Sequence, residues 1–364
     1  MRILFFSRDY TPHDQRFLTY LGKTGHEVYF LRLELRGRTG KNLAFPAGVE
    51  LVSWYGGRRE ARWQDILRYL RDLKRVIMDI RPDLIHAGPI QTCALLTALE
   101  GFRPLVSVSW GYDLLFDATR NRLWNWATRY TLRRSSVLVG DCEAVRHAAI
   151  SLGMKSDRTV IFPWGVDLDY FKPGEPDLKD DRRFTLLSLR SWEPIYGVDI
   201  LAQGFVLAAR ECPELRLVML GSGSLAEAIR SIFTRGGVIE RVITPGWTKP
   251  DELLRYYQSA DLYLSCSHVD GSSVSLMEAL ACGCPVLLSD IPGNREWVTQ
   301  GIQGWLFPDG DARALAEKIL TAVKNKQQLA GMGQAARRTA EQRADWRKNS
   351  AELLRAYQLA LDSN

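Results

Sequence analysis

The chain has 364 residues, of which 46% are hydrophobic and 25% charged, with a net charge of +6 and six scattered cysteines. This is an ordinary globular composition, large enough for two domains with full cores, so disulfide staples are not needed and the cysteines are expected to be buried hydrophobic residues. No apolar run approaches about 18 residues and the apolar start is too short for a signal peptide, so we expect a cytoplasmic protein.

The basic excess lies entirely in the first half of the chain. Residues 1–170 hold 25 Lys and Arg against 18 Asp and Glu, whereas residues 171–364 hold 23 against 24. Two stretches, 58–75 and 120–134, combine arginines with apolar or aromatic residues. Such helices dock on anionic membranes or present a solvated face, and both alternatives stay open, so membrane association is one candidate property. The lack of a recognised motif and of any excess in the second half argues against nucleic acid as a partner.

The first 165 residues alternate short apolar strands with amphipathic helices. A loop is expected over 7–14 and a helix around Phe17–Leu21. Strands are predicted near 3–6, 28–33, 49–54, 84–86, 105–108 and 137–139. This alternation predicts a doubly wound parallel sheet covered on both faces. Prolines and glycines between 162 and 176 interrupt the pattern, and we place the end of the first domain at residue 168.

A second series of alternating elements follows. Strands are predicted at 184–189, 215–220, 242–243, 262–265 and 286–289, and helices at 198–210, 225–233, 251–258 and from Ser273. The series predicts a second doubly wound α/β domain over 169–345. Two such domains facing one another would form a cleft at the carboxyl ends of their strands. The last helix, within 346–364, is expected to return to the first domain, 1–168.

The segment from Asp270 to Val286 is the most informative one. Asp270 and Glu278 are eight residues apart and flank the predicted helix start at Ser273. A helix N-terminus presents free N–H groups and a positive dipole end, which suits a phosphate group. The two carboxylates could accept hydrogen bonds from sugar and ribose hydroxyls. The spacing therefore indicates a site for a nucleotide sugar, with a serine-capped surface helix as the alternative.

Several further motifs accompany this segment. They are Gly25–Val28, Gly165–Asp167 with Phe171–Pro173, Leu220–Leu225, Tyr256–Asp261 and Pro292–Glu296. Together they cover nearly the whole chain, which resembles the retaining family 4 glycosyltransferases of GT-B fold. The resemblance implies two Rossmann-like domains, a nucleoside diphosphate sugar bound by the second, and transfer of a hexosyl unit with retention. The donor is expected to be a UDP-sugar first and a GDP-sugar second; the acceptor is a sugar, a lipid-linked or a small molecule.

The resemblance also assigns roles on the donor side. Asp270 would hold the sugar, Glu278 the ribose and Arg190 the diphosphate, because a guanidinium fork suits two phosphate oxygens. Further donor-binding candidates are Ser272, Ser273, Val274, Ser275, Gly221, Trp247 and Tyr196. Asp270 replaces the glutamate of the family and Tyr196 replaces its lysine, so the donor sugar stays open. Stabilisation of the leaving group must then depend on Arg190, on backbone N–H groups or on Tyr196 as a neutral donor.

The acceptor side departs further from the family pattern. The Gly-Gly pair after the first strand is replaced by Tyr10–Arg16, and the His-Gly-x-Asp motif begins with Trp110. We expect His13, Arg16 and Trp110 to lie on the acceptor side. Asp113 is expected to be a catalytic residue that orients an acceptor hydroxyl, unless it caps the following helix.

Two other patterns in the sequence are similar to metal-binding and dinucleotide-binding motifs. Asp167-Leu-Asp169 imitates a metal-binding DxD motif but lies in the junction, so we expect no metal and no cofactor. Gly221-Ser-Gly223 lacks the third glycine of a dinucleotide fingerprint. The missing lysine and histidine leave a non-catalytic nucleotide-sugar-binding protein as an alternative, beside a phosphorylase or epimerase of the same fold.

Overall fold

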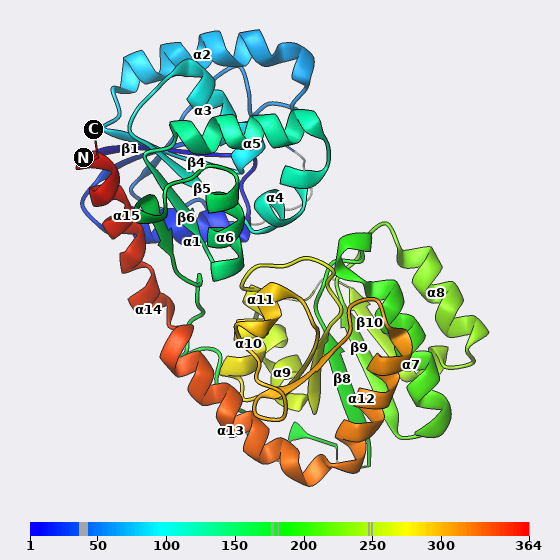
Figure 1. The fold of residues 1–364 in the computed structure, drawn as a ribbon. Helices are drawn as coiled ribbons and strands as arrows, with labels where there is room; N and C mark the ends of the chain where they lie inside the picture. Colours follow the sequence, from blue (N-terminus) through cyan, green and yellow to red (C-terminus); the bar gives the residue numbers. More distant parts are fainter. Residues whose placement is uncertain (36–42, 176–177, 181, 247, 249, 364) are drawn as a thin grey trace. The chain divides into compact units, whose positions relative to one another are not determined.

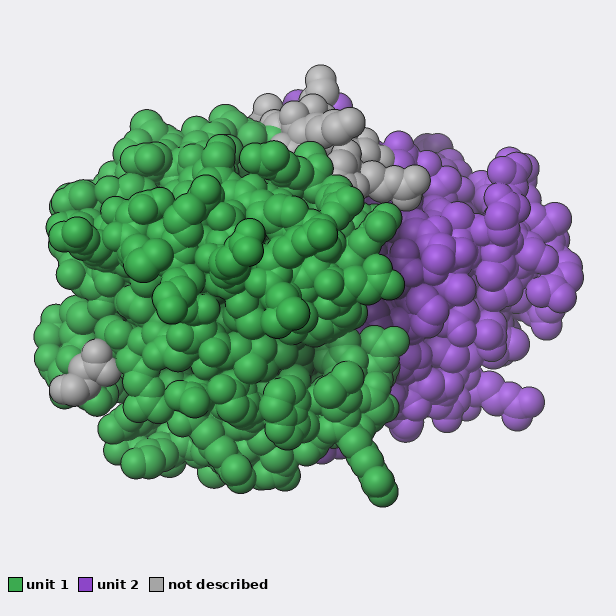
Figure 2. Space-filling view, turned by 90° about the horizontal axis from the view of Figure 1, so that it is seen from above, with its two compact units in different colours: residues 1–162, 350–364 green, residues 163–349 purple. Residues whose placement is uncertain are grey.

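A computed structural model describes residues 1–35, 43–175, 178–180, 182–246, 248 and 250–363. The chain forms two compact units, Met1–Phe162 with Ser350–Asn364, and Pro163–Asn349 (Figures 1 and 2). Each unit contains a parallel β-sheet, seven-stranded in the first and six-stranded in the second, which confirms the two predicted α/β domains. Within the described residues, none of the helices combines the length and the apolar character needed to cross a membrane.

The sheet of the first unit has the strand order β3-β2-β1-β4-β5-β6-β7. Its strands are β1 (Arg2–Ser7), β2 (Glu27–Arg32), β3 (Val49–Leu51), β4 (Leu84–Gly88), β5 (Leu105–Val108), β6 (Val137–Gly140) and β7 (Thr159–Ile161). The helices are α1 (Pro12–Leu21), α2 (Ile66–Ile80), α3 (Leu95–Glu100), α4 (Tyr112–Leu115), α5 (Arg122–Arg134), α6 (Glu143–Ser151) and α15 (Ala351–Leu361). Figure 1 shows α2, α3 and α5 on one side of this sheet and α1, α6 and α15 on the other.

The sheet of the second unit has the order β10-β9-β8-β11-β12-β13. Its strands are β8 (Phe184–Ser188), β9 (Leu215–Leu220), β10 (Val242–Gly246), β11 (Leu262–Ser265), β12 (Val286–Ser289) and β13 (Gly304–Phe307). The helices are α7 (Val198–Glu211), α8 (Ala226–Arg235), α9 (Pro250–Ser259), α10 (Val274–Ala281), α11 (Pro292–Arg295), α12 (Ala312–Lys324), α13 (Lys326–Arg343) and α14 (Trp346–Asn349). The edge strands β7 and β13 were not predicted from the sequence.

Both sheets reverse their strand order at one point, between β1 and β4 in the first unit and between β8 and β11 in the second. In open α/β sheets, ligands bind outside the carboxyl ends of the strands at such a switch point. Helices on both faces bury the strands, which explains their nearly continuous apolar sequences. In the second unit, Leu186, Leu217 and Leu264 of the sheet share one core with Phe205 of α7 and Ile319 of α12.

The boundary between the units lies after Phe162, earlier than the predicted end at residue 168. The reason is a pairing of two distant segments inside the second unit. The Val166 N–H donates to the Ala344 carbonyl at 2.7 Å, and the Trp346 N–H donates to the Val166 carbonyl at 3.1 Å. Gly165 has φ +74°, and a Cβ there would lie 2.8 Å from the Ala344 carbonyl oxygen. These contacts assign the junction segment to the second unit.

The last helix, α15, packs on the sheet of the first unit, where it contacts β4, β5, β6 and β7. Its Tyr357 is fully buried, with the hydroxyl 2.8 Å from His86 Nδ1. The His86 ring stacks on Phe5 with 4.0 Å between ring centroids. Burial lowers the pKa of His86 to about 3, so this histidine is neutral and needs one hydrogen-bond partner for each ring nitrogen. The Tyr357 hydroxyl therefore attaches α15 to the sheet through a polar contact in an apolar environment.

Replacing Tyr357 by Phe should destabilise the first unit. The substitution leaves His86 Nδ1 buried without this partner, which should lower the free energy of unfolding by about 1–3 kcal/mol. In hydrogen–deuterium exchange we expect faster exchange in peptides from β4 and unchanged exchange in β8 of the second unit. The matched control is Tyr29→Phe, which removes an exposed hydroxyl 3.3 Å from Glu27. Equal effects of the two substitutions on β4 would contradict the role of the buried contact.

Candidate functional site

Polar side chains gather at the switch point of the second unit. Arg190 follows β8, and Asp270 follows β11, the strand beside it. Arg190 Nη2 lies 2.8 Å from Asp270 Oδ2, and the two side chains are only 12% and 17% exposed. The sheet therefore brings together two oppositely charged residues that are 80 positions apart in the sequence.

Arg190 is held by two further contacts. Its Nη1 donates a hydrogen bond of 2.7 Å to Ser273 Oγ. Its Cζ lies 4.2 Å from the centre of the Tyr196 ring, a cation–π contact. Tyr196, which stands where the family has a lysine, thus supports the guanidinium with its ring. The position of Arg190 is fixed from three directions.

Two atoms of this pair lack hydrogen-bond partners among the described residues. Arg190 Nε and Asp270 Oδ2 are both buried and form no hydrogen bond there. Asp270 Oδ2 still touches Arg190 Nη2 at 2.8 Å, so its charge is compensated, but the orientation is not that of a hydrogen bond. Buried polar atoms are normally satisfied, by protein, water or ligand. Water or a polar ligand can supply the missing partners of this pair.

The ionisation of the pair follows from its burial. Burial raises the pKa of the Asp270 carboxyl, and the nearby Arg190 guanidinium opposes this shift. For Arg190, burial is the largest effect and acts to lower the pKa, but the combined charge interactions with Asp270 and with three neighbouring tyrosines raise the pKa overall. Arg190 therefore stays charged and can bind an anion.

Helix α10 begins beside this pair, at Val274, which confirms the predicted helix start near Ser273. Ser273 is the N-cap residue, but its side chain makes no capping hydrogen bond. Its hydroxyl accepts from Arg190 instead and lies 3.1 Å from Ser275 Oγ. The alternative of a serine-capped surface helix is therefore wrong. A helix start without a side-chain cap keeps N–H groups available for an anion.

Two buried tyrosines support the polar residues of α10. Tyr257 of α9 donates a hydrogen bond of 2.7 Å to Glu278 Oε2. The hydroxyl of Tyr263, in β11, lies 2.7 Å from Ser275 Oγ, and burial raises the pKa of Tyr263 to about 12. Neither tyrosine was predicted for the site, although Tyr257 lies in the Tyr256–Asp261 motif. Tyr263 lies on the predicted strand just before the Asp270 loop, and this position could have indicated that its side chain is near the site.

Close backbone contacts place the two loops that carry Arg190 and Asp270. A Cβ at Gly293 would lie 2.5 Å from the Asp270 carbonyl oxygen, so only glycine permits this approach of α11. Gly221 has φ +101°, and a Cβ there would lie 3.0 Å from the Arg190 carbonyl oxygen. Ser272 Oγ accepts from Trp297 Nε1 at 3.0 Å. Gly221 and Ser272 are thus placed where they shape the site loops, while Trp247 lies outside the described residues.

The residues predicted for the acceptor side lie in the first unit. His13 and Arg16 are not in a loop, because α1 already begins at Pro12 with a capping box between Thr11 and Asp14. His13 is half-buried, and its ring centre lies 5.5 Å from that of Trp110. Trp110 follows β5, so these rings meet at the carboxyl edge of the first sheet.

Asp113 lies in the first unit, inside a network of hydrogen bonds. It is completely buried, and its carboxylate accepts hydrogen bonds from Ser109 Oγ at 2.6 Å and from the backbone N–H groups of Ile90 at 3.1 Å and Leu114 at 3.0 Å. Burial raises its pKa to about 6. These bonds join the segments that follow β4 and β5. Asp113 does not cap α4, whose N-cap is Gly111. Its expected role at an acceptor hydroxyl stays a prediction.

The DxD-like segment of the junction is a hydrogen-bonded turn. Asp167 Oδ1 accepts from the backbone N–H groups of Asp169 and Tyr170 at 3.0 and 3.2 Å, and Asp169 pairs with Arg347. Across the part of the chain that the structure describes, no group of three or more His, Cys, Asp or Glu side chains is arranged to hold a metal ion.

Comparisons with known proteins identify the family of the chain. Residues 175–339 match the family profile "Glycosyl transferases group 1", and residues 15–170 match "Glycosyltransferase Family 4". A GDP-mannose-dependent alpha-(1-6)-phosphatidylinositol monomannoside mannosyltransferase from Mycolicibacterium smegmatis is 25% identical over 311 residues, which are 77% of this chain and 78% of that protein. For three other curated glycosyltransferases, the chain spans only about half of their length.

Solved structures of the same architecture cover the whole chain. Anabaena HepE in complex with UDP-glucose superimposes with a TM-score of 0.79 at 20% identity, over 98% of this chain and 99% of that one. Sucrose-phosphate synthase from Thermosynechococcus elongatus gives 0.83 at 15% identity, over 100% of both chains. These likenesses confirm the predicted GT-B fold. With family profiles matched in both halves, the chain belongs to the group 1, family 4 glycosyltransferases.

Proposed function

We propose that the chain transfers a hexosyl unit from a nucleoside diphosphate sugar to an acceptor hydroxyl with retention at the anomeric carbon. A UDP-sugar is the first candidate donor and a GDP-sugar the second. The observation that carries the proposal is the buried Arg190–Asp270 pair, with its two unsatisfied atoms, beside the uncapped start of α10. Anabaena HepE, whose fold this chain shares, was solved with UDP-glucose, and the mycobacterial relative is named for GDP-mannose.

In the proposed complex, the diphosphate lies against the first N–H groups of α10, at Val274 and Ser275, and Arg190 binds its oxygens. Asp270 accepts from hydroxyls of the donor sugar, and Glu278 accepts from the ribose. The transition state places growing negative charge on the diphosphate, and preorganised donors stabilise that charge. Because Tyr196 carries no positive charge where the family has a lysine, Arg190 and the helix start supply this stabilisation.

Retention is proposed from the family resemblance, in which the leaving phosphate helps to deprotonate the acceptor. No metal is required in this scheme. A rival is a protein that binds the nucleotide sugar without turnover, since the lysine and the histidine of the family are both replaced. Slow hydrolysis of the donor in the absence of an acceptor, followed by NMR, separates the two. A retained configuration of the released sugar supports the proposal, and binding without any hydrolysis supports the rival.

The nucleotide can be identified by thermal shift with UDP, GDP, ADP and dTDP. At 100 times its dissociation constant, a ligand that binds only the folded state adds about 2.7 kcal/mol of stability. We expect UDP to give the largest shift and GDP the second. No shift with any of the four nucleotides would contradict a nucleotide site in the second unit.

Arg190 and Asp270 should affect the nucleotide in opposite ways. Arg190→Gln removes a charged donor and should weaken UDP binding by about tenfold to a hundredfold. Asp270→Asn frees the guanidinium from its counter-charge, so the affinity for UDP should stay equal or rise, while turnover falls by about a hundredfold or more. Calorimetry and donor hydrolysis measure the two quantities.

The matched control is Arg183→Gln, which breaks an exposed ion pair of 3.4 Å with Asp180 in the same unit. It should change neither quantity. If Asp270→Asn weakened UDP binding as much as Arg190→Gln does, the assignment of the carboxylate to the sugar would be wrong.

Glu278 should act on the nucleoside part of the donor. Glu278→Gln removes the negative charge of the side chain that accepts from the Tyr257 hydroxyl and that contacts the ribose in the proposed complex. UDP should therefore bind about tenfold more weakly. The free base uracil contains no ribose and serves as the comparison ligand. Its weak binding, measured by NMR, should be the same in the variant and the wild type; a matching loss for uracil would place Glu278 elsewhere in the site.

A further inference from the structure

A second polar site lies in the first unit, at the carboxyl edge of its sheet. A cavity of about 330 Å³ is present there, and its lining includes Arg8, Arg62, Trp63, Asp117, Arg120 and Trp124. Arg8 directly follows β1, and Asp117 and Arg120 follow β5 through α4. The cavity thus opens beside the switch point between β1 and β4, the expected position of a ligand in this kind of sheet.

The charges around this cavity are not balanced. Arg8 is paired with the buried Glu34 at 2.7 Å. Neither Arg62 nor Arg120 has a described carboxylate within ion-pair distance, but the Asp117 carboxylate in the same lining interacts electrostatically with Arg120. Burial raises the pKa of Asp117, and Arg120 and Arg8 oppose that shift. Two guanidinium groups are therefore available for an anion, and their planar fork suits the oxygens of a phosphate or carboxylate.

Two tryptophans border the same cavity. Trp63 is 60% exposed, and Trp124 is half-buried under Arg120, whose Cζ lies 5.5 Å from the ring centre. An exposed tryptophan beside a cavity offers a flat apolar surface to a ring of the ligand, and large exposed apolar side chains of this kind mark binding sites. The lining thus combines an aromatic platform with positive charge.

We propose that this cavity binds the acceptor and that the acceptor carries a phosphate group next to a sugar ring. The inference rests on the proposed transferase function, which makes the first unit the acceptor side. The lining keeps a net positive charge even with Asp117 counted, which suits a phosphate monoester, and a cavity of about 330 Å³ is at the small end of ligand sites, suited to one ring with its charged group. The phosphate can belong to a soluble sugar phosphate or to a lipid head group.

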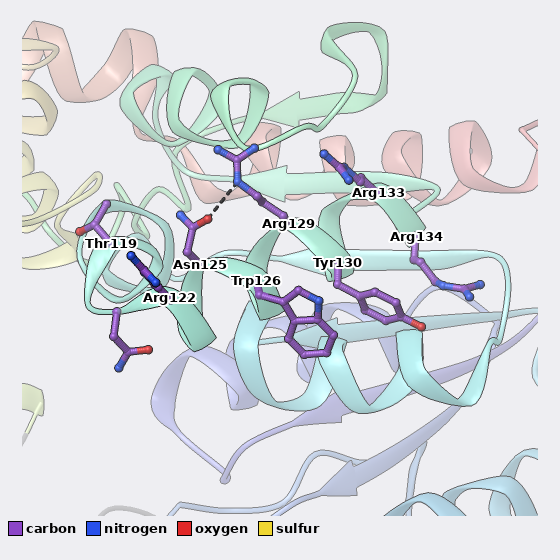
Figure 3. A pocket seen from close by; sticks show the side chains of 9 residues that line it. Thr119, Arg122, Asn125, Trp126, Arg129, Tyr130, Arg133 and Arg134 are labelled. Atoms are coloured by element: carbon purple, nitrogen blue, oxygen red, sulfur yellow. Dashed lines mark hydrogen bonds between the residues drawn. The ribbon is translucent and has the colours of Figure 1, made fainter.

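The outer surface of α5 bears on this choice of source. Figure 3 shows four arginines and two aromatic rings along a separate groove on this helix. Trp126 stacks on Tyr130 with 5.4 Å between centroids, and Arg134 lies 5.3 Å from the Tyr130 ring centre. A basic and aromatic helix face is suited to an anionic bilayer. A test must therefore separate the cavity from this groove.

The test measures binding of a hexose 6-phosphate to the full chain by calorimetry, with the neutral methyl hexoside and the hexuronate for comparison. We expect the wild type to bind the phosphate at least about tenfold more tightly than the neutral sugar. Arg62→Gln and Arg120→Gln should each remove most of this preference. Arg71→Gln, an exposed position on α2 away from the cavity, and Arg133→Gln on the outer face of α5 should retain it.

Equal binding of the charged and the neutral sugar, or a preference for the hexuronate, would overturn the proposal for a soluble acceptor. The proposal as a whole is then overturned unless the cavity binds a lipid head group in the vesicle experiment that follows.

The lipid arm uses sedimentation with phosphatidylinositol vesicles and with neutral phosphatidylcholine vesicles. Binding to the anionic vesicles that is lost in Arg62→Gln and Arg120→Gln assigns the cavity to a lipid head group. If vesicle binding is lost only in the double variant Arg133→Gln/Arg134→Gln, the α5 groove binds the vesicles. If the wild type then also fails to bind the soluble phosphate, the cavity is not a phosphate site. UDP binding is measured in every variant and should not change. If the wild type binds UDP but neither the soluble phosphate nor the anionic vesicles, this inference alone is refuted, whereas absent UDP binding in the wild type refutes the transferase function.

Discussion

The buried contact between Arg190 and Asp270 is the interaction on which the site of the second unit depends. Removing two charges from water is costly, and a buried ion pair recovers that cost only when its remaining polar atoms are satisfied. Here Arg190 Nε and Asp270 Oδ2 form no hydrogen bonds with the described residues. Such a pair is a poor source of stability, which is consistent with the proposed role of the pair in binding a polar ligand. The tightly packed loops around it keep this unfavourable arrangement in place.

Much of the fold follows from the sequence because the buried strands form uninterrupted apolar segments. The edge strands β7 and β13 were not predicted, although strands of the same length, β3 and β12, were. Strand β13 begins at Gly304, whose φ is +155°, and glycine is not typical of a strand. The junction escaped prediction because the pairing of Val166 with the Ala344–Trp346 segment is a contact between distant parts of the chain, which local patterns do not encode.

The candidate site was predictable where function requires particular residue types at a fixed spacing, as in Asp270 and Glu278. It was not predictable where a role depends on burial. Asp113 lies in a motif position that predicts a catalytic role, but its carboxylate is completely buried and accepts three hydrogen bonds. Ser273 has the identity of a capping residue, yet its hydroxyl binds Arg190. In both cases the side chain has a partner that is distant in the sequence, and only the tertiary structure shows which partner is within reach.

The replacement of a cation by Tyr196 has a consequence for how the diphosphate can be stabilised. With a second positive charge present, the diphosphate would stay stabilised even if the first charge moved slightly, because both charges contribute. With one guanidinium, stabilisation depends on where that group sits relative to the N–H groups of α10. The Tyr196 ring at 4.2 Å and the Ser273 hydroxyl at 2.7 Å restrict its motion without adding charge. Preorganised donors need no reorganisation when charge develops, so accurate placement can compensate for part of the missing charge. In the proposed reaction, the Tyr196 ring beneath Arg190 thus stabilises the leaving group by holding the guanidinium in position.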